Sequence, residues 1–334
     1  MRILFVHNSL TSFVRFDLES LREHFQVTEC PIVSRFFNPI ALWRKVREHD
    51  LVFGWFASWH TVLPVLMARL QFKPSILVVG GYDLANMPQI RYGHQRRGIR
   101  RYVTRFTMAI ASRLVTNSHY SAAEAINAGV AASKLEVIYH GLEDDFGQPF
   151  HHARGRTVLT VGNVNYSNIE RKGLRLFVEA ASFVPDAHFT VVGAWQDRTI
   201  HQLQAIAPAN VHFTGRLSDE DLHAHYRKAA VYVQGSQHEG FGLSLAEAML
   251  AGCVPVATQA GAIPEVVGDC AYFCESRAPE SLGRAIRLAL EAPEHERLRA
   301  RKRILDEFPA EKRREELERL ISNVHPCKQT HTEE

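Results

Sequence analysis

The sequence predicts an α/β protein with two doubly wound domains, each built on a parallel sheet with helices on both faces. Three observations support this prediction. The chain has 334 residues, about twice the length of a typical domain. Short apolar segments rich in β-branched residues alternate with amphipathic segments along nearly the whole chain, as expected where parallel strands are buried on both faces. A polar segment that contains Gly and Pro, 143–156, separates two such series.

The first series begins close to the N-terminus. Its predicted strands are 3–6, 51–55, 75–79, 114–117 and 136–139, and its predicted helices include 12–24, 60–70 and 120–128. Between Asp50 and Arg69 the only polar side chains are those of Ser58, His60 and Thr61, and an apolar segment of this length can be read as a membrane span. We interpret it instead as a strand, a turn and a buried helix that opens near Pro64, because polar residues cluster at the break.

The second series follows the polar segment. Its predicted strands are 157–161, 188–192, 211–213, 231–234 and 254–257, with helices at 173–183, 218–228 and 243–251. Ser218 followed by Asp221 is typical of a capping box at the start of a helix. From residue 278 onward the pattern is helical and highly charged.

These series define the predicted domains. The first is expected at 1–145 and the second at 153–308, followed by a C-terminal helix at 309–324 and a frayed end at 325–334. Ligands of doubly wound domains bind at the carboxyl ends of the strands. We therefore expect the site in a cleft between the two domains.

Composition excludes several classes of protein. The chain is 46% hydrophobic and 22% charged, which is ordinary for a globular protein and excludes disorder. A net charge of +3 is too small to indicate a nucleic-acid partner. None of the five cysteines forms a CxxC pair, and no signal peptide precedes the first strand. We expect reduced thiols and a cytoplasmic protein, without a bound metal because no HExxH motif is present.

The most informative segment is 237–252. A predicted strand leads into a loop with Gly240 and Gly242, and a helix follows. Glycines let backbone amides approach a ligand closely, and a helix N-terminus favours an anion. Glu239 lies in the loop and Glu247 lies about one turn into the helix, so two carboxylates could accept hydrogen bonds from the hydroxyls of a sugar and of a ribose. The alternative is an exposed loop before an ordinary core helix, with Glu247 on the solvent-exposed face of that helix.

This segment resembles the E-x7-E signature of the retaining glycosyltransferases of family 4, also called glycosyl transferases group 1. Four neighbouring motifs occur in the order of that family: a Lys-Gly pair at Lys172, a Val-Gly pair at Gly162, a Phe-Thr-Gly turn at 213–215 and the segment 261–267. The segment 137–141 also matches. The resemblance is strong over 115–268 and rests on topology alone over the first hundred residues.

The resemblance implies the GT-B fold, with two Rossmann-like domains facing a central cleft and a C-terminal helix packed back on the first domain. It also implies a retaining, metal-independent transfer of a sugar from a UDP- or GDP-sugar to a glycan, lipid or small-molecule acceptor, without a further cofactor. Lys172 would reach the diphosphate, Glu239 would orient the sugar and Glu247 would hold the ribose. The other residues expected at the donor are Asn163, Arg171, Arg216, His238, Gly240, Phe241, Gly242 and Leu243.

The sequence departs from the family in three places. Asn163 stands where the family commonly has an Arg that contacts the diphosphate, and either Arg171 or Arg216 is a candidate to replace it. The glycine-rich loop after the first strand is missing. The segment 80–83 replaces a His near the acceptor. Asp83 is then a candidate catalytic residue for contact with the acceptor hydroxyl or the sugar, and its alternative is an Asx turn or a helix cap.

Two other classes of function remain open. Asn163 and the missing His are compatible with a nucleotide-sugar-binding protein with little turnover. A different enzyme on the same architecture, such as a nucleotide-sugar epimerase or a dinucleotide oxidoreductase, is the other class. The absence of GxGxxG after the first strand disfavours the oxidoreductase.

One segment is strongly basic. Residues 84–123 contain seven arginines and no acid. Those between 91 and 105 are Arg91, Arg96, Arg97, Arg100, Arg101 and Arg105. The last four fall at helical spacing, which is compatible with contact to an anionic acceptor or to anionic lipid headgroups at the inner membrane face. The alternative is a solvated helix face.

Overall fold

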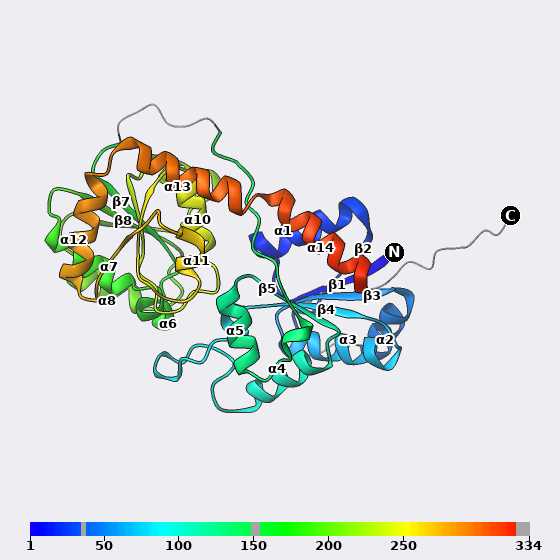
Figure 1. Ribbon diagram of the computed structural model, residues 1–334. Helices are drawn as coiled ribbons and strands as arrows, with labels where there is room; N and C mark the ends of the chain where they lie inside the picture. Colours follow the sequence, from blue (N-terminus) through cyan, green and yellow to red (C-terminus); the bar gives the residue numbers. More distant parts are fainter. Residues whose placement is uncertain (35–37, 148–153, 325–334) are drawn as a thin grey trace. The chain divides into compact units, whose positions relative to one another are not determined.

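The computed structural model describes residues 1–34, 38–147 and 154–324. The chain forms two compact units, and Figure 1 shows the elements of each. The N-terminal unit comprises residues 1–88, 92–141 and the segment from 310 onward, and the C-terminal unit comprises 89–91 and 142–309. Each unit contains a six-stranded sheet in which all the strand pairs are parallel, which confirms the predicted fold class. The segment 325–334, predicted to fray, lies outside the described residues.

The sheet of the N-terminal unit has the strand order β2-β1-β3-β4-β5-β6. Its strands are β1 (Arg2–His7), β2 (Gln26–Pro31), β3 (Leu51–Trp55), β4 (Ser75–Val79), β5 (Arg113–Thr116) and β6 (Leu135–Val137). Sequence analysis did not predict β2. This strand lies at the edge of the sheet and alternates exposed with partly or fully buried residues, so it lacks the continuous apolar run by which the central strands are recognised.

Helices cover both faces of this sheet (Figure 1). On one face, α1 (Ser12–His24) and α14 (Ala310–Val324) share a core with β1, β3 and β4. On the other face lie α2 (Pro39–Glu48), α3 (Trp59–Leu70), α4 (Ile99–Ile110) and α5 (His119–Asn127).

Two details of these helices correct the sequence analysis. The predicted helix 60–70 is α3, which begins one residue earlier at Trp59 and contains Pro64 within it, and the backbone N–H of Ser58 donates to Thr61 Oγ1 at 3.0 Å at its start. α4 begins at Ile99, so Arg97 precedes the helix and only Arg100, Arg101 and Arg105 lie on it. No helix within the described residues is long and apolar enough to span a membrane.

A buried ion pair holds α14 in the N-terminal unit. Arg313 donates to both carboxylate oxygens of Asp17 on α1, at 2.7 and 2.8 Å, and both side chains are almost fully buried. The same guanidinium donates to the backbone carbonyls of Ile138 and Tyr139 and lies 5.8 Å from the ring centroid of Trp55. These bonds satisfy a charge that would otherwise be costly to bury.

The sheet of the C-terminal unit has the order β12-β11-β10-β7-β8-β9. Its strands are β7 (Thr157–Val161), β8 (His188–Val192), β9 (Val211–Gly215), β10 (Val231–Gln234), β11 (Val254–Ala257) and β12 (Tyr272–Phe273). The helices are α6 (Tyr166–Arg171), α7 (Leu174–Ala180), α8 (Thr199–Ile206), α9 (Asp219–Lys228), α10 (Leu243–Leu250), α11 (Ile263–Val267), α12 (Pro279–Leu290) and α13 (Glu294–Glu307). Ser218 caps α9 as predicted, accepting from the N–H of Asp221 at 3.1 Å.

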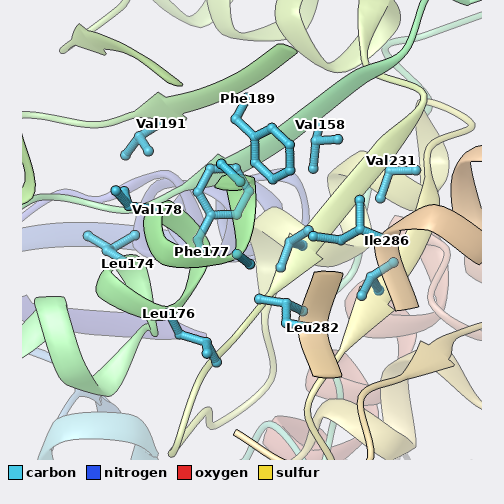
Figure 2. Packing of buried hydrophobic residues seen from close by; sticks show 14 of the residues in the cluster. Val158, Leu174, Leu176, Phe177, Val178, Phe189, Val191, Val231, Leu282 and Ile286 are labelled. Carbon is cyan, nitrogen blue, oxygen red and sulfur yellow. The ribbon is translucent and has the colours of Figure 1, made fainter. Parts of the chain in front are cut away.

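A single apolar cluster joins α7 and α12 to this sheet. Phe177 of α7 and Phe189 of β8 meet with their ring centroids 5.2 Å apart, and Figure 2 shows Leu282 and Ile286 of α12 in the same cluster. The core fixes the positions of the strand ends, and the loops that follow β7 and β10 are therefore held by a rigid support.

Candidate functional site

The carboxyl ends of two neighbouring strands bring Lys172 and Glu239 together. β7 and β10 are paired in the sheet. The loop after β7 leads through α6 to Lys172, and the loop after β10 carries Glu239. The Nζ atom of Lys172 lies 3.9 Å from Oε2 of Glu239. Two residues that are 67 apart in the sequence therefore form an ion pair at the edge where doubly wound sheets bind ligands.

Arg171 joins this pair and is the most firmly held of the three. Its Nη1 lies 3.7 Å from Oε2 of Glu239 and donates to the carbonyl of His238 at 3.2 Å. Its Nε and Nη2 both donate to Oδ1 of Asn168. The guanidinium is buried, so it supplies a fixed positive charge beside the more exposed ammonium of Lys172.

Lys172 lies between two helices, because α6 ends just before it. Sequence analysis expected Lys172 at the start of a single helix and did not predict α6. The residue is the C-cap of α6, and Gly173, the N-cap of α7, follows. A cation at a helix C-terminus is stabilised by the helix dipole, so its position does not by itself require a bound anion.

Two glycines let the loops of the site approach one another. Gly173 has a φ of 71°, and a Cβ at this position would lie 2.1 Å from the carbonyl oxygen of Gly235. Gly261, in the loop after β11, has a φ of 60°, and its Cβ would lie 2.3 Å from the carbonyl oxygen of Glu239. Any side chain at either position would push the loops apart.

Burial and the neighbouring charges shift the pKa values of Lys172 and Glu239. Burial lowers the pKa of Lys172, and the neighbouring Arg171 lowers it further, while Glu239 opposes both. Burial alone would raise the pKa of Glu239, but Lys172 and Arg171 outweigh it, so its pKa lies below the usual value. Glu239 is therefore ionised at neutral pH. Its Oε2 also accepts hydrogen bonds from Gln234 and Ser236, at 3.1 and 3.2 Å.

Glu247 lies in the second turn of α10 and is bound by Tyr226 of α9. The Tyr226 hydroxyl donates to Oε2 of Glu247 at 2.9 Å. Burial raises the pKa of Glu247, and this hydrogen bond counteracts part of the effect. Sequence analysis did not single out Tyr226. No local motif marks it, because it meets Glu247 only through the packing of α9 beside α10.

The other predicted donor residues fall into two groups. Gly240, Phe241, Gly242 and Leu243 lie with Glu239 on the loop that enters α10, and Gly242 is its N-cap, with a φ of 102°. His238 is buried in the same loop. Asn163 is exposed, and its Oδ1 accepts from the N–H of Ala194 at 3.1 Å. Arg216 is exposed just after β9, at the edge of the sheet, and makes no ion pair with the described residues. Of the two arginines considered as replacements at the diphosphate, Arg171 is the one that lies beside Lys172.

Asp83 lies in the N-terminal unit and bonds to two loops. Its Oδ1 accepts from the N–H of Gly80 and its Oδ2 from the N–H of Ala57, both at 2.9 Å. The bond to Gly80 is the local cap that sequence analysis considered as an alternative role. Burial raises the pKa of Asp83 to about 7, although the two N–H donors oppose this.

Asp83 also lines a cavity of about 710 Å³ within the N-terminal unit. The remaining lining residues are Asn8, Ser9, Phe56, Ser58, Trp59, His60, Leu63, Tyr82, His94, Ile99, Arg100, Val103 and Thr104. Sequence analysis did not recognise His60 as part of a site. Its Nε2 donates to the carbonyl of Trp55 at 2.8 Å, and burial lowers its pKa to about 4, so the ring is neutral. Within the described ranges, no group of three His, Cys, Asp or Glu side chains could hold a metal ion.

Two family models match the chain. The model named Glycosyl transferases group 1 matches residues 143–304, and the model named Glycosyltransferase Family 4 matches residues 13–146. The MMP alpha-(1->4)-mannosyltransferase of Mycolicibacterium hassiacum is 28% identical over 195 residues, which are 54% of this chain and 46% of that protein.

A second relative is the GDP-mannose:cellobiosyl-diphosphopolyprenol alpha-mannosyltransferase of Xanthomonas campestris. It is 33% identical over 135 residues, which are 38% of this chain and 35% of that protein. The chain thus spans less than half of the length of either curated relative. The crystal structure of Anabaena Alr3699/HepE with UDP-glucose has a TM-score of 0.77, at 16% identity, and covers 97% of this chain and 100% of that one. This likeness shows the fold. The chain therefore belongs to the family-4 glycosyltransferases and has the GT-B fold.

Proposed function

We propose that this glycosyltransferase moves a sugar from a nucleoside diphosphate sugar to an acceptor hydroxyl, with retention of the anomeric configuration and without a metal ion. The observation that carries the proposal is the cluster of Lys172, Arg171 and Glu239 at the carboxyl edge of β7 and β10. Two cations at this edge suit a diphosphate, and an ionised carboxylate suits the hydroxyls of a sugar.

The reaction develops negative charge on the leaving diphosphate. Lys172 and Arg171 are placed to stabilise that charge, and the N–H groups behind Gly242 add the positive end of α10. This arrangement supports transfer without a metal, because the protein itself supplies the counter-charge. The sequence carries Asn163 where the family has an arginine, and Arg171 takes over that role.

The two glutamates divide the recognition of the donor between them. Glu239 Oε2 is occupied by Gln234 and Ser236, which leaves Oε1 to accept from the transferred sugar. Glu247 Oε2 is occupied by Tyr226, which leaves its other oxygen for the ribose diol. In both residues the internal bonds fix the carboxylate orientation before the donor binds, and preorganisation of this kind lowers the entropic cost of binding.

We assign the acceptor to the cavity of the N-terminal unit, with Asp83 as the group that contacts its hydroxyl. The carboxyl, with a pKa of about 7, can take up a proton near neutral pH. One relative is named for a diphosphopolyprenol-linked acceptor, and a lipid-linked sugar is therefore a candidate acceptor here beside a glycan or a small molecule. The proposed compartment is the cytoplasm, in keeping with Cys30, Cys253, Cys270 and Cys274, which are free thiols.

The test is turnover with UDP-glucose and with GDP-mannose, because a fold neighbour binds UDP-glucose and a relative uses GDP-mannose. Release of UDP or GDP, with and without lipid-linked or free sugar acceptors, identifies the donor. Nuclear magnetic resonance of the product then gives its anomeric configuration. Glu247→Gln should weaken donor binding about 10- to 150-fold, the range for hydrogen bonds to a charged group. Lys172→Met should lower kcat about 100- to 1,000-fold.

Matched controls are Glu294→Gln and Lys228→Met, two exposed residues of the same unit. Both should leave donor binding and kcat unchanged. If neither donor is turned over but one nucleotide binds and Glu247→Gln abolishes its binding, the protein is a nucleotide-sugar-binding protein and the transferase proposal is wrong. An inverted product would contradict retention alone.

A further inference from the structure

We propose that the N-terminal unit docks on the surface of an anionic phospholipid bilayer. The docking surface consists of the solvent-facing sides of α2, α3 and α4 and the turn after α3, and we call it the α2–α4 face. The basic segment 91–105, singled out in the sequence, contributes only part of the α2–α4 face. The proposal concerns a binding partner and stands independently of the sugar-transfer reaction.

The α2–α4 face is positively charged. Residues 39–123 contain twelve lysines and arginines but only three acidic residues, Glu48, Asp50 and Asp83, and Asp83 is buried. Four exposed cations on this face make no ion pair with any described residue, namely Arg44, Lys45, Arg69 and Arg100, and Arg97, just before α4, is exposed and unpaired in the same way. Uncompensated cations that lie close together repel one another, and an anionic surface relieves that repulsion.

Large apolar side chains are exposed between these cations. They are Ile40 and Trp43 on α2, Leu70 and Phe72 at the end of α3, and Ile99, Tyr102 and Phe106 on α4. Ile99 and Tyr102 are 75% and 69% exposed. Basic residues interleaved with aromatic and aliphatic ones are typical of surfaces that lie in the headgroup region of a bilayer. The phosphates of a nucleic acid would pair with the cations, but a nucleic acid would leave the exposed aliphatic side chains of this face in water.

Phe72 is the most informative residue of the face. It is 99% exposed and has a φ of 55°, a left-handed conformation that is unfavourable for a residue with a side chain. The next residue holds this turn in place, because the Lys73 ammonium donates to the carbonyls of Val46 and Arg47 at the end of α2. An aromatic ring is thus presented to solvent by a firmly bonded turn, which an insertion into lipid would explain.

The opposite face of the same unit has a different character. α1 and α14 carry six exposed or partly exposed glutamates, namely Glu19, Glu23, Glu311, Glu315, Glu316 and Glu318. Two of the exposed or partly exposed arginines there have acidic partners, in the pairs Arg22–Glu29 and Arg314–Glu311. Charge is therefore distributed unequally between the two faces of the N-terminal unit. On α1 and α14 five exposed or partly exposed cations, Arg15, Arg22, Lys312, Arg314 and Arg319, nearly cancel these glutamates. An anionic surface would therefore attract the α2–α4 face more strongly than the other.

Docking would also bring lipid to the cavity described above. Ile99 and Arg100 belong to the α2–α4 face and line that cavity at the same time. The helix that contacts the bilayer thus forms one wall of the cavity, so a lipid-borne acceptor would not have to leave the membrane surface.

The experiment is flotation of the full chain with vesicles of phosphatidylcholine alone or of an equimolar mixture with phosphatidylglycerol. We expect binding to the mixed vesicles that weakens as salt is added. Arg44→Gln/Arg69→Gln should lower the partition coefficient about 30-fold, because each basic residue near the surface contributes a factor of about five. Leu70→Ser should lower it about fivefold through loss of buried aliphatic area.

The controls carry the same chemical changes elsewhere. Arg15→Gln/Arg319→Gln removes two exposed arginines from α1 and α14, and Leu288→Ser removes a similarly exposed leucine from α12. Neither control should change vesicle binding. The proposal is wrong if the mixed vesicles bind no better than phosphatidylcholine, if the controls weaken binding as much as the test variants, or if single-stranded DNA is bound in place of vesicles. Unchanged unfolding temperatures of the variants exclude misfolding as a cause.

Discussion

The hydroxyl of Tyr226 donates a hydrogen bond of 2.9 Å to Oε2 of Glu247, and the tyrosine is completely buried. The bond fixes one carboxylate oxygen of a residue at the predicted nucleotide site and leaves the other oxygen for a ligand. It also lowers the pKa of Glu247 against the effect of burial. Tyr226 is therefore a positioning residue for the glutamate that we assign to the ribose.

Tyr226→Phe tests this relationship. Loss of one hydrogen bond should weaken nucleoside diphosphate binding about two- to tenfold. The pKa of Glu247 should also rise, so binding should fall off at a higher pH than in the wild type, because only the carboxylate accepts from both ribose hydroxyls. Isothermal titration calorimetry over a pH series measures both effects. Tyr102→Phe, at an exposed position, should change neither, and an unchanged pH profile in Tyr226→Phe would rule out the positioning role.

Gly173→Ala should disrupt the loop that carries Lys172. The substitution forces a side chain into a φ of 71° and places its Cβ 2.1 Å from the Gly235 oxygen. We expect a loss of about 3 kcal/mol or more in the free energy of unfolding, measured with urea. Gly129→Ala separates the two causes, because Gly129 also has a positive φ but open space around it. It should cost only about 1–2 kcal/mol, and an equal loss in both variants would show that the contact with Gly235 does not matter.

Arg313→Met should destabilise the N-terminal unit. The change leaves Asp17 buried without its partner and removes the donor to the Ile138 and Tyr139 carbonyls. Removal of one member of a buried pair typically costs about 3–5 kcal/mol. Urea unfolding of Arg319→Met provides the comparison. Arg319 is exposed on the same helix, so its loss should cost less than about 0.5 kcal/mol, and similar values for the two variants would contradict the importance of the buried pair.

His60 should make the stability depend on pH. Its pKa is about 4 in the folded chain and about 6.5 in an unfolded one. The neutral ring is therefore favoured by folding, so its contribution is complete above pH 6.5 and is lost as the pH falls through 4. The change amounts to about 3 kcal/mol. His60→Gln keeps a donor for the Trp55 carbonyl and cannot titrate, so the free energy of unfolding should fall less steeply between pH 6.5 and 4. A slope equal to that of the wild type would contradict the low pKa.

The sequence by itself determined the fold class and the position of the loop that carries Glu239 in the C-terminal unit. Continuous apolar runs such as β3, β4 and β7 were predicted with their observed bounds, because burial on both faces leaves a local signature. The glycine at 242 could likewise be placed in a loop before α10 from the sequence, because its left-handed φ of 102° is a local property of the backbone.

Tertiary structure alone decided which distant residues meet. Only the adjacency of β7 and β10 brings Arg171 to Glu239 and leaves Arg216 apart after β9. The packing of α9 beside α10 supplies Tyr226 to Glu247. The edge strand β2 and the exposed Phe72 also escaped prediction, because a half-buried strand and a strained turn have no distinctive hydrophobic period. The hydrophobic period of a segment indicates only how that segment is buried. Ion pairs, cavities and charged surfaces depend instead on which segments pack against one another.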